Sequence, residues 1–173
     1  RIISYSISNI DRALRSKYDC ARGHMSYSTE FKRIFAELIE DMDCKKSEIP
    51  KKLGIDYNIY VKIKEYGAIP RPVILERIAD YFDVSVEYLL GRTDDPYFER
   101  SAKKHTFRER YDELRAAKGM TEYAVAKMLH IGTSYTTSWK KHGYIPSLDY
   151  LLTLAEIFGV SLDYLLGRTD YKK

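Results

Sequence analysis

The chain has 173 residues, of which 45% are hydrophobic, and a formal net charge of +4. This length allows one or two small domains. No apolar run approaches the roughly 18 residues of a membrane helix, and no signal peptide is predicted. Cys20 and Cys44 lack metal-ligand spacing, so the sequence predicts a reducing, cytoplasmic location and neither a metal site nor a cofactor.

Residues 1–24 precede the first methionine, Met25. The run Gly23-His24-Met25 resembles a cloning remnant, so we expect that part of this N-terminal segment is not native. No function is assigned to it.

An internal repeat determines the predicted domain organisation. The run VSVEYLLGRTD at 84–94 recurs as VSLDYLLGRTD at 160–170, an offset of 76 residues. With this offset, residues 31–94 align with residues 107–170 without a gap, and the shared positions are mostly apolar or turn residues. Two copies of one small fold explain such a repeat. We therefore predict an all-α chain with a first five-helix domain at 25–94, a linker at 95–106 and a second five-helix domain at 107–173.

The second and third predicted helices of the first copy carry unusual residues. Pro50 lies in the second helix, and proline inside a helix costs about 3 kcal/mol unless it lies in the first turn. We therefore expect this helix to be short and to begin near Ser47. Tyr57 and Asn58 open the third helix, and Lys62 follows them. Asn58 suits bidentate pairing with adenine, although Asn is also an ordinary residue at a helix start.

The linker from Asp95 to Thr106 contains Pro96 and a charged run. If extended, it reaches up to roughly 40 Å. That length is enough to place two modules on adjacent turns of a DNA duplex, about 34 Å apart.

The second copy begins with a predicted helix from Phe107 to Lys118, which Gly119 ends. Its last two helices are predicted to begin after Ser147 and Ser161, because serine is a favoured N-cap. The first of them runs through Phe158.

Between these helices, residues 121–146 predict a helix, a sharp turn and a second helix. Thr121 is a suitable N-cap, and Val125 and Leu129 lie on one helical face. His130 tolerates the left-handed conformation that the turn requires. The second helix is expected to open at Gly132 or Thr133, with its exposed face formed by Thr133, Ser134, Thr137, Ser138 and Lys141. Hydroxyls and an ammonium group suit DNA bases and phosphates, as in a helix-turn-helix recognition unit.

Charge is distributed in agreement with this interpretation. Residues 127–147 contain three lysines and no acidic residue, as a surface that faces phosphates requires. Tyr135 is expected either to touch the sugar-phosphate backbone or to form an apolar patch for a partner. Trp139 is expected in the core or at its rim. No catalytic arrangement of residues is present, so an enzyme is not predicted.

Several runs resemble the Cro/CI-type (XRE) helix-turn-helix repressors: LRAAKGMT at 114–121, AKML at 126–129, IPSL at 145–148 and VSLDYLLGRTD at 160–170. The resemblance implies a five-helix, lambda-repressor-like fold whose third helix enters the major groove. It also implies that amide groups at the start of the second and third helices hold phosphates.

The chain departs from the family pattern at several positions. Glu122 stands where the family has a phosphate-clamping Gln, and Lys46 stands there in the first copy. The family's ion pair between the first and third helices is absent, which is expected to leave Lys64 and Lys140 free to face phosphate. Tyr60 and Thr136 occupy positions where the family buries Ile or Val, so we expect unusual packing of both third helices.

The sequence therefore predicts a sequence-specific DNA-binding transcriptional regulator, and we expect a repressor. The partner is double-stranded DNA, and regulation is expected through a protein, a peptide or abundance. The chain acts as a monomer with two pseudo-equivalent domains or as a homodimer, on an asymmetric or direct-repeat site. The predicted DNA-binding residues are Thr121, Thr133, Ser134, Tyr135, Thr137, Ser138, Lys140 and Lys141, with Lys46, Tyr57, Asn58, Lys62 and Lys64 in the first copy.

The alternative is a protein-docking module of the antirepressor or antitoxin type, in which the first copy has lost DNA binding. Its apolar surface would consist of Pro50, Ile59, Tyr60 and Val61.

Overall fold

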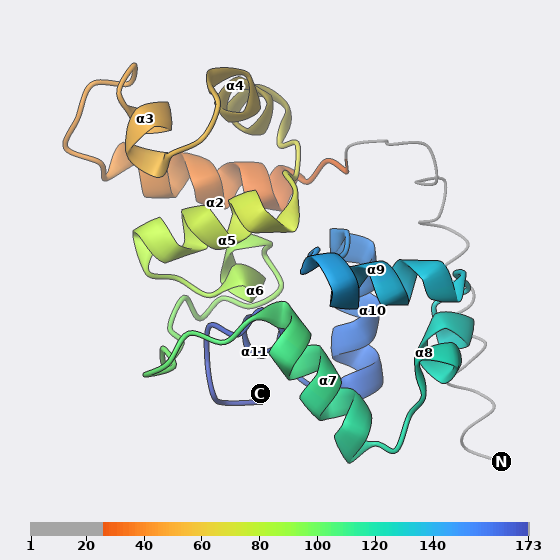
Figure 1. The fold of residues 1–173 in the computed structure, drawn as a ribbon. Coiled ribbons are helices and arrows are strands. Elements are labelled where there is room, and N and C mark those ends of the chain that lie inside the picture. The colour runs from red at the N-terminus through yellow and green to blue at the C-terminus, as the bar shows by residue number, and fades with distance from the viewer. Residues whose placement is uncertain (1–25, 173) are drawn as a thin grey trace, which may run out of the picture.

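The computed structural model describes residues 26–172, and the segment 1–24 and Cys20 lie outside this range. Within the described residues the chain forms ten helices and no strand, which confirms the all-α prediction (Figure 1). A single isolated β-bridge joins Tyr27 to Ala68. None of the described helices has the length and apolar character needed to span a bilayer.

The helices follow one another in two series of five. The first series, here called the N-terminal half, comprises α2 (Thr29–Glu40), α3 (Ile49–Leu53), α4 (Tyr57–Tyr66), α5 (Pro72–Phe82) and α6 (Val86–Leu89). The second series, the C-terminal half, comprises α7 (Phe107–Ala117), α8 (Glu122–Met128), α9 (Thr133–His142), α10 (Leu148–Phe158) and α11 (Leu162–Leu165). The last three helices of each series begin and end at positions separated by the same 76 residues as the sequence repeat.

Local capping explains most of these boundaries. The hydroxyl of Thr121 accepts a hydrogen bond from the Ala124 amide at 3.1 Å, and that of Ser161 accepts one from the Tyr164 amide at 3.0 Å. Ser147 precedes α10 as predicted, but its side chain makes no capping hydrogen bond. His130 adopts a φ of 53°, the left-handed conformation expected at the turn between α8 and α9.

Helix α3 is short, as Pro50 predicted, but it begins at Ile49 rather than near Ser47. The reason is steric and electronic: proline has no amide hydrogen and is tolerated only in the first turn. The helix therefore forms only where Pro50 falls within that turn.

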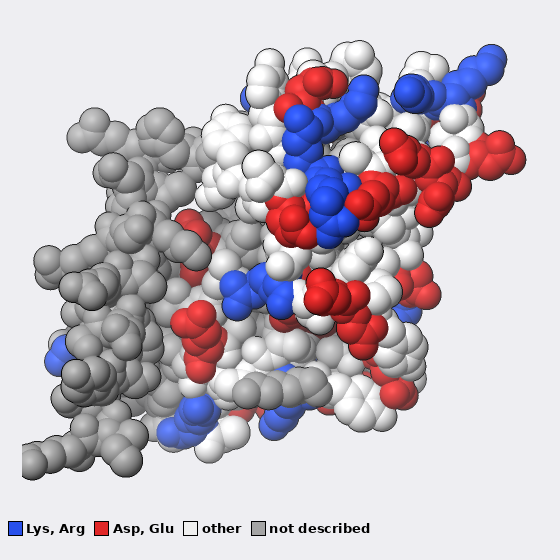
Figure 2. All heavy atoms as spheres, turned by 180° about the vertical axis from the view of Figure 1, so that it is seen from behind, with Lys and Arg blue, Asp and Glu red and all other residues white. Residues whose placement is uncertain are grey.

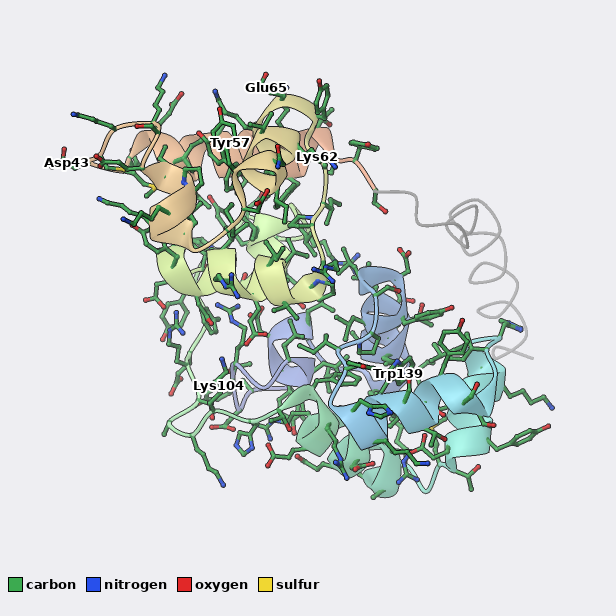
Figure 3. The ribbon with its side chains drawn as sticks, turned by 45° about the horizontal axis from the view of Figure 1, so that its top comes forward. Asp43, Tyr57, Lys62, Glu65, Lys104 and Trp139 are labelled. Carbon is green, nitrogen blue, oxygen red and sulfur yellow. The ribbon has the colours of Figure 1, made fainter. Side chains whose placement is uncertain are left out.

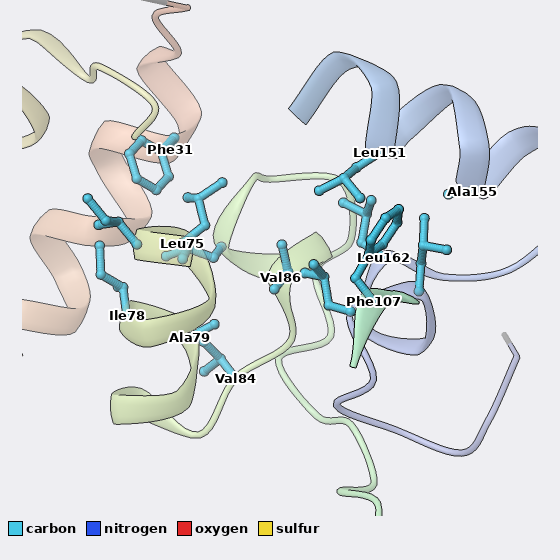
Figure 4. Close-up of a cluster of buried hydrophobic side chains, with 14 of the residues drawn as sticks. Phe31, Leu75, Ile78, Ala79, Val84, Val86, Phe107, Leu151, Ala155 and Leu162 are labelled. Atoms are coloured by element: carbon cyan, nitrogen blue, oxygen red, sulfur yellow. The ribbon is translucent and has the colours of Figure 1, made fainter. Parts of the chain in front are cut away.

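The two halves share a continuous buried core. In the N-terminal half, Phe31 from α2 packs with Leu75 and Ile78 from α5, all of them almost fully buried. Figure 4 shows that Val86 of α6 and Leu162 of α11 lie between this cluster and the aromatic core around Phe107. The two halves are consequently held against each other by apolar contacts as well as by the chain that joins them.

The predicted linker, residues 95–106, is folded against both halves and does not extend. The Ser85 amide donates to the Pro96 carbonyl at 2.9 Å, and the Ser101 amide donates to the Arg168 carbonyl at 2.9 Å. Arg100 pairs with Asp80 at 3.1 Å and with Asp83 at 2.7 Å. Because the linker is folded, it does not hold the two halves apart at its extended length in this structure.

Candidate nucleic-acid interface

Helices α8 and α9 pack against each other across the turn at His130. Val125 and Ala126 of α8 and Leu129 after it are buried, and Ile131 is half-buried beneath the turn. The Ile131 amide donates to the Ala126 carbonyl at 3.0 Å, which closes the corner. The segment that the sequence predicted as a helix-turn-helix has this geometry in the structure.

Helix α9 has one buried and one exposed face. Trp139 is 5% exposed, and its ring lies edge-on to Phe107 at 6.2 Å and to Tyr111 at 6.0 Å between centroids (Figure 3). This placement confirms the core role expected for Trp139. Elsewhere on the helix, Thr133, Ser134, Tyr135 and Lys141 are exposed, and Thr137 and Ser138 are half-buried.

Thr136 and Tyr60, which stand where the family buries Ile or Val, are themselves buried. The Thr136 hydroxyl donates to the Thr133 carbonyl at 3.0 Å, so its polar group is satisfied within the helix. Tyr60 packs edge-on against Phe35 with centroids 6.1 Å apart. Both helices thus keep a buried side chain at this position. The packing differs from the family pattern only in the type of that side chain, which is Tyr60 in α4 and Thr136 in α9.

The hydroxyls of α9 are not all free. Ser138 donates to the Tyr135 carbonyl at 2.7 Å, a bond back to the preceding turn of its own helix. A hydroxyl that donates in this way still has lone pairs with which to accept a hydrogen bond. Ser134 and Thr133 are the residues of this face that the structure leaves most open to a partner.

The start of α9 differs from the start of α4. Gly132 precedes α9 and offers no side chain to cap it, whereas Asp56 caps α4 by accepting from the Asn58 amide at 2.8 Å. The Tyr135 amide donates to the Gly132 carbonyl at 3.0 Å, and no side chain caps the amides of Thr133 and Ser134, whereas in α4 the Asp56 carboxylate accepts from one of the first amides, that of Asn58. Asp56 is absent from the residues predicted to affect this site, although an Asp directly before a helix is recognisable in the sequence as an N-cap.

Glu122 does not present a free negative charge to the surface. Its carboxylate lies 3.4 Å from Arg115 Nε and accepts a hydrogen bond from the Tyr111 hydroxyl at 3.0 Å. Burial, together with the neighbouring Glu122 carboxylate, raises the pKa of Tyr111, which therefore stays a neutral donor. Arg115 also donates to the Met120 carbonyl at 2.8 Å. Arg115 lacks the acidic partner that the family has in the third helix, and it pairs instead with Glu122 of α8.

The lysines predicted to bind DNA differ in their exposure to solvent. Lys141 is exposed at the end of α9, and the side chain of Lys140 lies outside what the structure describes. In the N-terminal half, Lys46 and Lys62 are exposed. Lys64 lies 3.5 Å from Glu65 in an ion pair whose two side chains are exposed, and its contact with phosphate stays a prediction.

Tyr57 and Asn58 lie exposed at the start of α4, as predicted, with Lys62 one turn further along (Figure 3). Pro50 and Tyr60, however, are buried, and Ile59 and Val61 are only half-buried. The apolar surface predicted for the docking alternative is therefore not formed by these four residues.

Charge elsewhere on the molecule is mixed. On the face shown in Figure 2, Lys and Arg side chains lie among Asp and Glu side chains. Arg33, for example, pairs with both Glu30 and Glu37 along α2. A surface of this kind has no net attraction for a polyanion, in contrast to the acid-free segment that contains α9.

Comparison with known proteins shows similarity to one family model and to two curated relatives. Residues 112–165, from within α7 to the end of α11, match a family model described as helix-turn-helix. The chain is 34% identical over 65 residues to the HTH-type transcriptional regulator ImmR of Bacillus subtilis, covering 38% of this chain and 51% of the relative. It is 36% identical over 62 residues to the uncharacterized HTH-type transcriptional regulator YobD of the same organism, covering 36% of this chain and 55% of the relative.

The chain thus spans about half the length of the curated relatives it matches. No solved structure shows a significant match. The geometry and the family model agree on one segment: residues 112–165, which contain the α8–turn–α9 unit, match a helix-turn-helix.

Proposed function

We propose that this protein is a sequence-specific DNA-binding transcriptional regulator in which α9 enters the major groove of double-stranded DNA. The observation that carries the proposal is the division of α9 into two faces. Trp139 and Thr136 fix the helix to the core, while Thr133, Ser134 and Lys141 are exposed. Hydroxyls and an ammonium group can hydrogen-bond to base edges and phosphates.

The roles of the individual groups follow from their positions. Lys141, at the end of α9, is assigned to a phosphate. Ser134 and Thr137, on the open face, are assigned to base edges. The uncapped amides after Gly132 would hold a second phosphate, because the positive end of the helix dipole lies there.

The N-terminal half is proposed to be a second copy of the same module, with α4 as its reading helix. Tyr57, Asn58 and Lys62 are exposed on that helix. Since the Asp56 carboxylate accepts from the Asn58 amide and places a negative charge at the start of α4, we expect this half to bind DNA more weakly than the C-terminal half. Two modules in one chain would act as a covalent dimer, and repression would follow from occupancy of a promoter.

The proposal is tested by gel retardation and salt titration with the purified chain. Lys141→Ala should weaken binding to all duplexes and reduce the slope of log affinity against log salt by about 1, since one phosphate contact is lost. Ser134→Ala should instead change the base preference at one position by roughly 1–3 kcal/mol while leaving the salt slope unchanged.

Lys104→Ala is the matched control. It also removes one positive charge, but Lys104 lies in the linker segment, where it pairs with Glu76 at 3.1 Å, and Figure 3 shows it away from α9. Equal losses for the Lys141 and Lys104 variants would assign the effect to net charge and refute the interface. Absence of any retarded complex at low salt would favour the docking alternative.

A further inference from the structure

Two hydrogen bonds between the halves form a reciprocal pair. The Val86 amide at the start of α6 donates to the Asp163 carboxylate, at 2.9 Å to Oδ2. The Leu162 amide at the start of α11 donates to Glu87 Oε1. Val86 corresponds to Leu162 in the sequence repeat, and Glu87 corresponds to Asp163. The acidic residue in the first turn of each helix therefore accepts a hydrogen bond from the first amide of the other helix.

Such reciprocity is the property of an isologous interface. When residue i of one unit contacts residue j of the other, and j contacts i in return, the two units are related by a two-fold axis. Helices α6 and α11 lie side by side at the centre of the molecule (Figure 1). The apolar side chains of Val86 and Leu162 meet at the same place (Figure 4).

A buried arginine then fixes this arrangement. The Arg168 side chain is 2% exposed and pairs with Asp163 of its own half. It also reaches across the interface to Asp80 at 3.0 Å and to the Val84 carbonyl at 3.0 Å. The guanidinium group lies over the Phe98 ring of the linker, 4.3 Å from its centroid. Separation of the halves would break the Arg168 contacts with Asp80 and the Val84 carbonyl and would expose the apolar surface buried between the halves, which is unfavourable.

We infer that a single chain binds an inverted pair of unlike half-sites, with the spacing between them fixed by the α6–α11 interface. The inference rests on the proposed function, extended to both halves. A two-fold relation places α4 and α9 in opposite directions along a duplex, and the symmetry of the protein is mirrored in the site. Of the two site types expected from the sequence, the asymmetric one is retained and the direct repeat is replaced.

The half-sites are unlike because the reading faces differ. In the register of the repeat, the exposed Tyr57 and Asn58 stand opposite Thr133 and Ser134. Lys62 likewise corresponds to Ser138. Because the two half-sites have different sequences, their inverted orientation cannot be recognised from the sequence of the natural binding site. It can be recognised only when the two reading faces are made alike, because the site is then a palindrome.

The decisive experiment makes them alike in the full chain. A variant carrying Tyr57→Thr, Asn58→Ser, Ile59→Tyr, Val61→Thr, Lys62→Ser and Glu65→Lys gives α4 the reading face of α9, including the counterpart of Lys141, and leaves the buried Tyr60 and Ile63 untouched. Its preferred duplex is selected from a random library. We expect a palindrome with half-site centres about 10 base pairs apart. A direct repeat, or a single half-site for each chain, would overturn the inference.

A spacing series with the unaltered chain gives a second, independent measurement. Insertion of about 5 base pairs between the selected half-sites turns them to opposite faces of the duplex. A rigid pair of halves should then bind at least about 10-fold more weakly, at the level of one half-site. Unchanged affinity would show that the halves move independently and would also overturn the inference.

These outcomes are separable from failure of the proposed function. If the unaltered chain retards no duplex at low salt, DNA binding itself is refuted. If it binds one duplex specifically but tolerates the insertion, DNA binding stands and only the fixed inverted arrangement falls. If the six-residue variant does not fold, tolerance of the insertion by the unaltered chain still overturns the inference, because the inference requires a fixed spacing.

Discussion

The two glycines that end α4 and α9 share a left-handed backbone but have different surroundings. Gly67 has a φ of 65° and Gly143 a φ of 64°. A Cβ on Gly67 would collide with the Ser28 backbone carbonyl. Ser28 cannot easily move away, because its amide donates a hydrogen bond to the Gly67 carbonyl at 2.9 Å. A Cβ on Gly143 would meet nothing within 4 Å. The same substitution therefore tests conformational strain alone at one site, and strain with a backbone clash at the other.

We predict that Gly143→Ala lowers the free energy of unfolding by about 1–2 kcal/mol, the cost of a left-handed non-glycine residue. Gly67→Ala should cost more, because the chain around Ser28 must also move. Urea unfolding followed by circular dichroism measures both. Equal losses for the two variants would contradict the role assigned to the Ser28 contact.

At the scale of the element, α9 is a helix with poor intrinsic stability. Its sequence, TSYTTSWKKH, contains five Ser and Thr residues, which compete for backbone hydrogen bonds. Tertiary packing must therefore hold it in place, and Trp139 supplies the largest contact, with Phe107, Tyr111 and Tyr150 around its ring. The reading face is presented by an element that depends on one aromatic anchor.

Trp139→Ala is accordingly expected to destabilise the protein by about 3–5 kcal/mol, the usual cost of removing a buried large aromatic side chain. DNA binding should be lost with the order of α9, although Trp139 itself does not face the partner. Trp139→Phe is the control and should retain most of the binding. A change in unfolding free energy below about 0.5 kcal/mol for Trp139→Ala, a value typical of surface positions, would show that the ring is not the anchor.

At the scale of the whole molecule, the junction between the halves holds two carboxyl groups close together. Burial and the adjacent Asp163 carboxyl raise the pKa of Glu87 from its ordinary 4.5 to about 8, so Glu87 is protonated in the folded chain near neutrality. Arg168 pairs with Asp163, and within residues 26–172 no Lys or Arg forms an ion pair with Glu87. The junction thus contains a proton that the unfolded chain would release.

The sign of the pH effect follows from this difference. An acid whose folded pKa exceeds its unfolded pKa contributes full stability below the unfolded value, and loses it as the pH rises towards the folded value. Between pH 4.5 and about 8, Glu87 should therefore lower stability by at most about 1.4 kcal/mol per pH unit. Glu87→Gln, which stays neutral, should remove this decline.

The measurement is the difference in unfolding free energy between the unaltered chain and the Glu87→Gln variant from pH 5 to 8. Subtraction cancels the titration of other groups, and exposed Glu156→Gln serves as the control that should leave the pH profile unchanged. Parallel profiles for the unaltered chain and the Glu87 variant would show that Glu87 does not hold a proton at the junction.

The sequence by itself determined the helices and the candidate reading face. Periodicity, caps and glycine stops are local properties, so α9 begins, and α10 begins and ends, where the residues around them predict. The exposure of Ser134 followed from its place on the predicted helix, and the core role of Trp139 followed from its correspondence to Ile63 in the repeat.

Only the tertiary structure decided how residues distant in the sequence pair. Glu122 is neutralised by Arg115, Tyr60 is buried in the core, and the linker is folded against both halves. The reciprocal capping of α6 and α11 joins positions more than 70 residues apart. No local pattern specifies such a contact, because it depends on which surfaces meet when both halves bury their apolar faces.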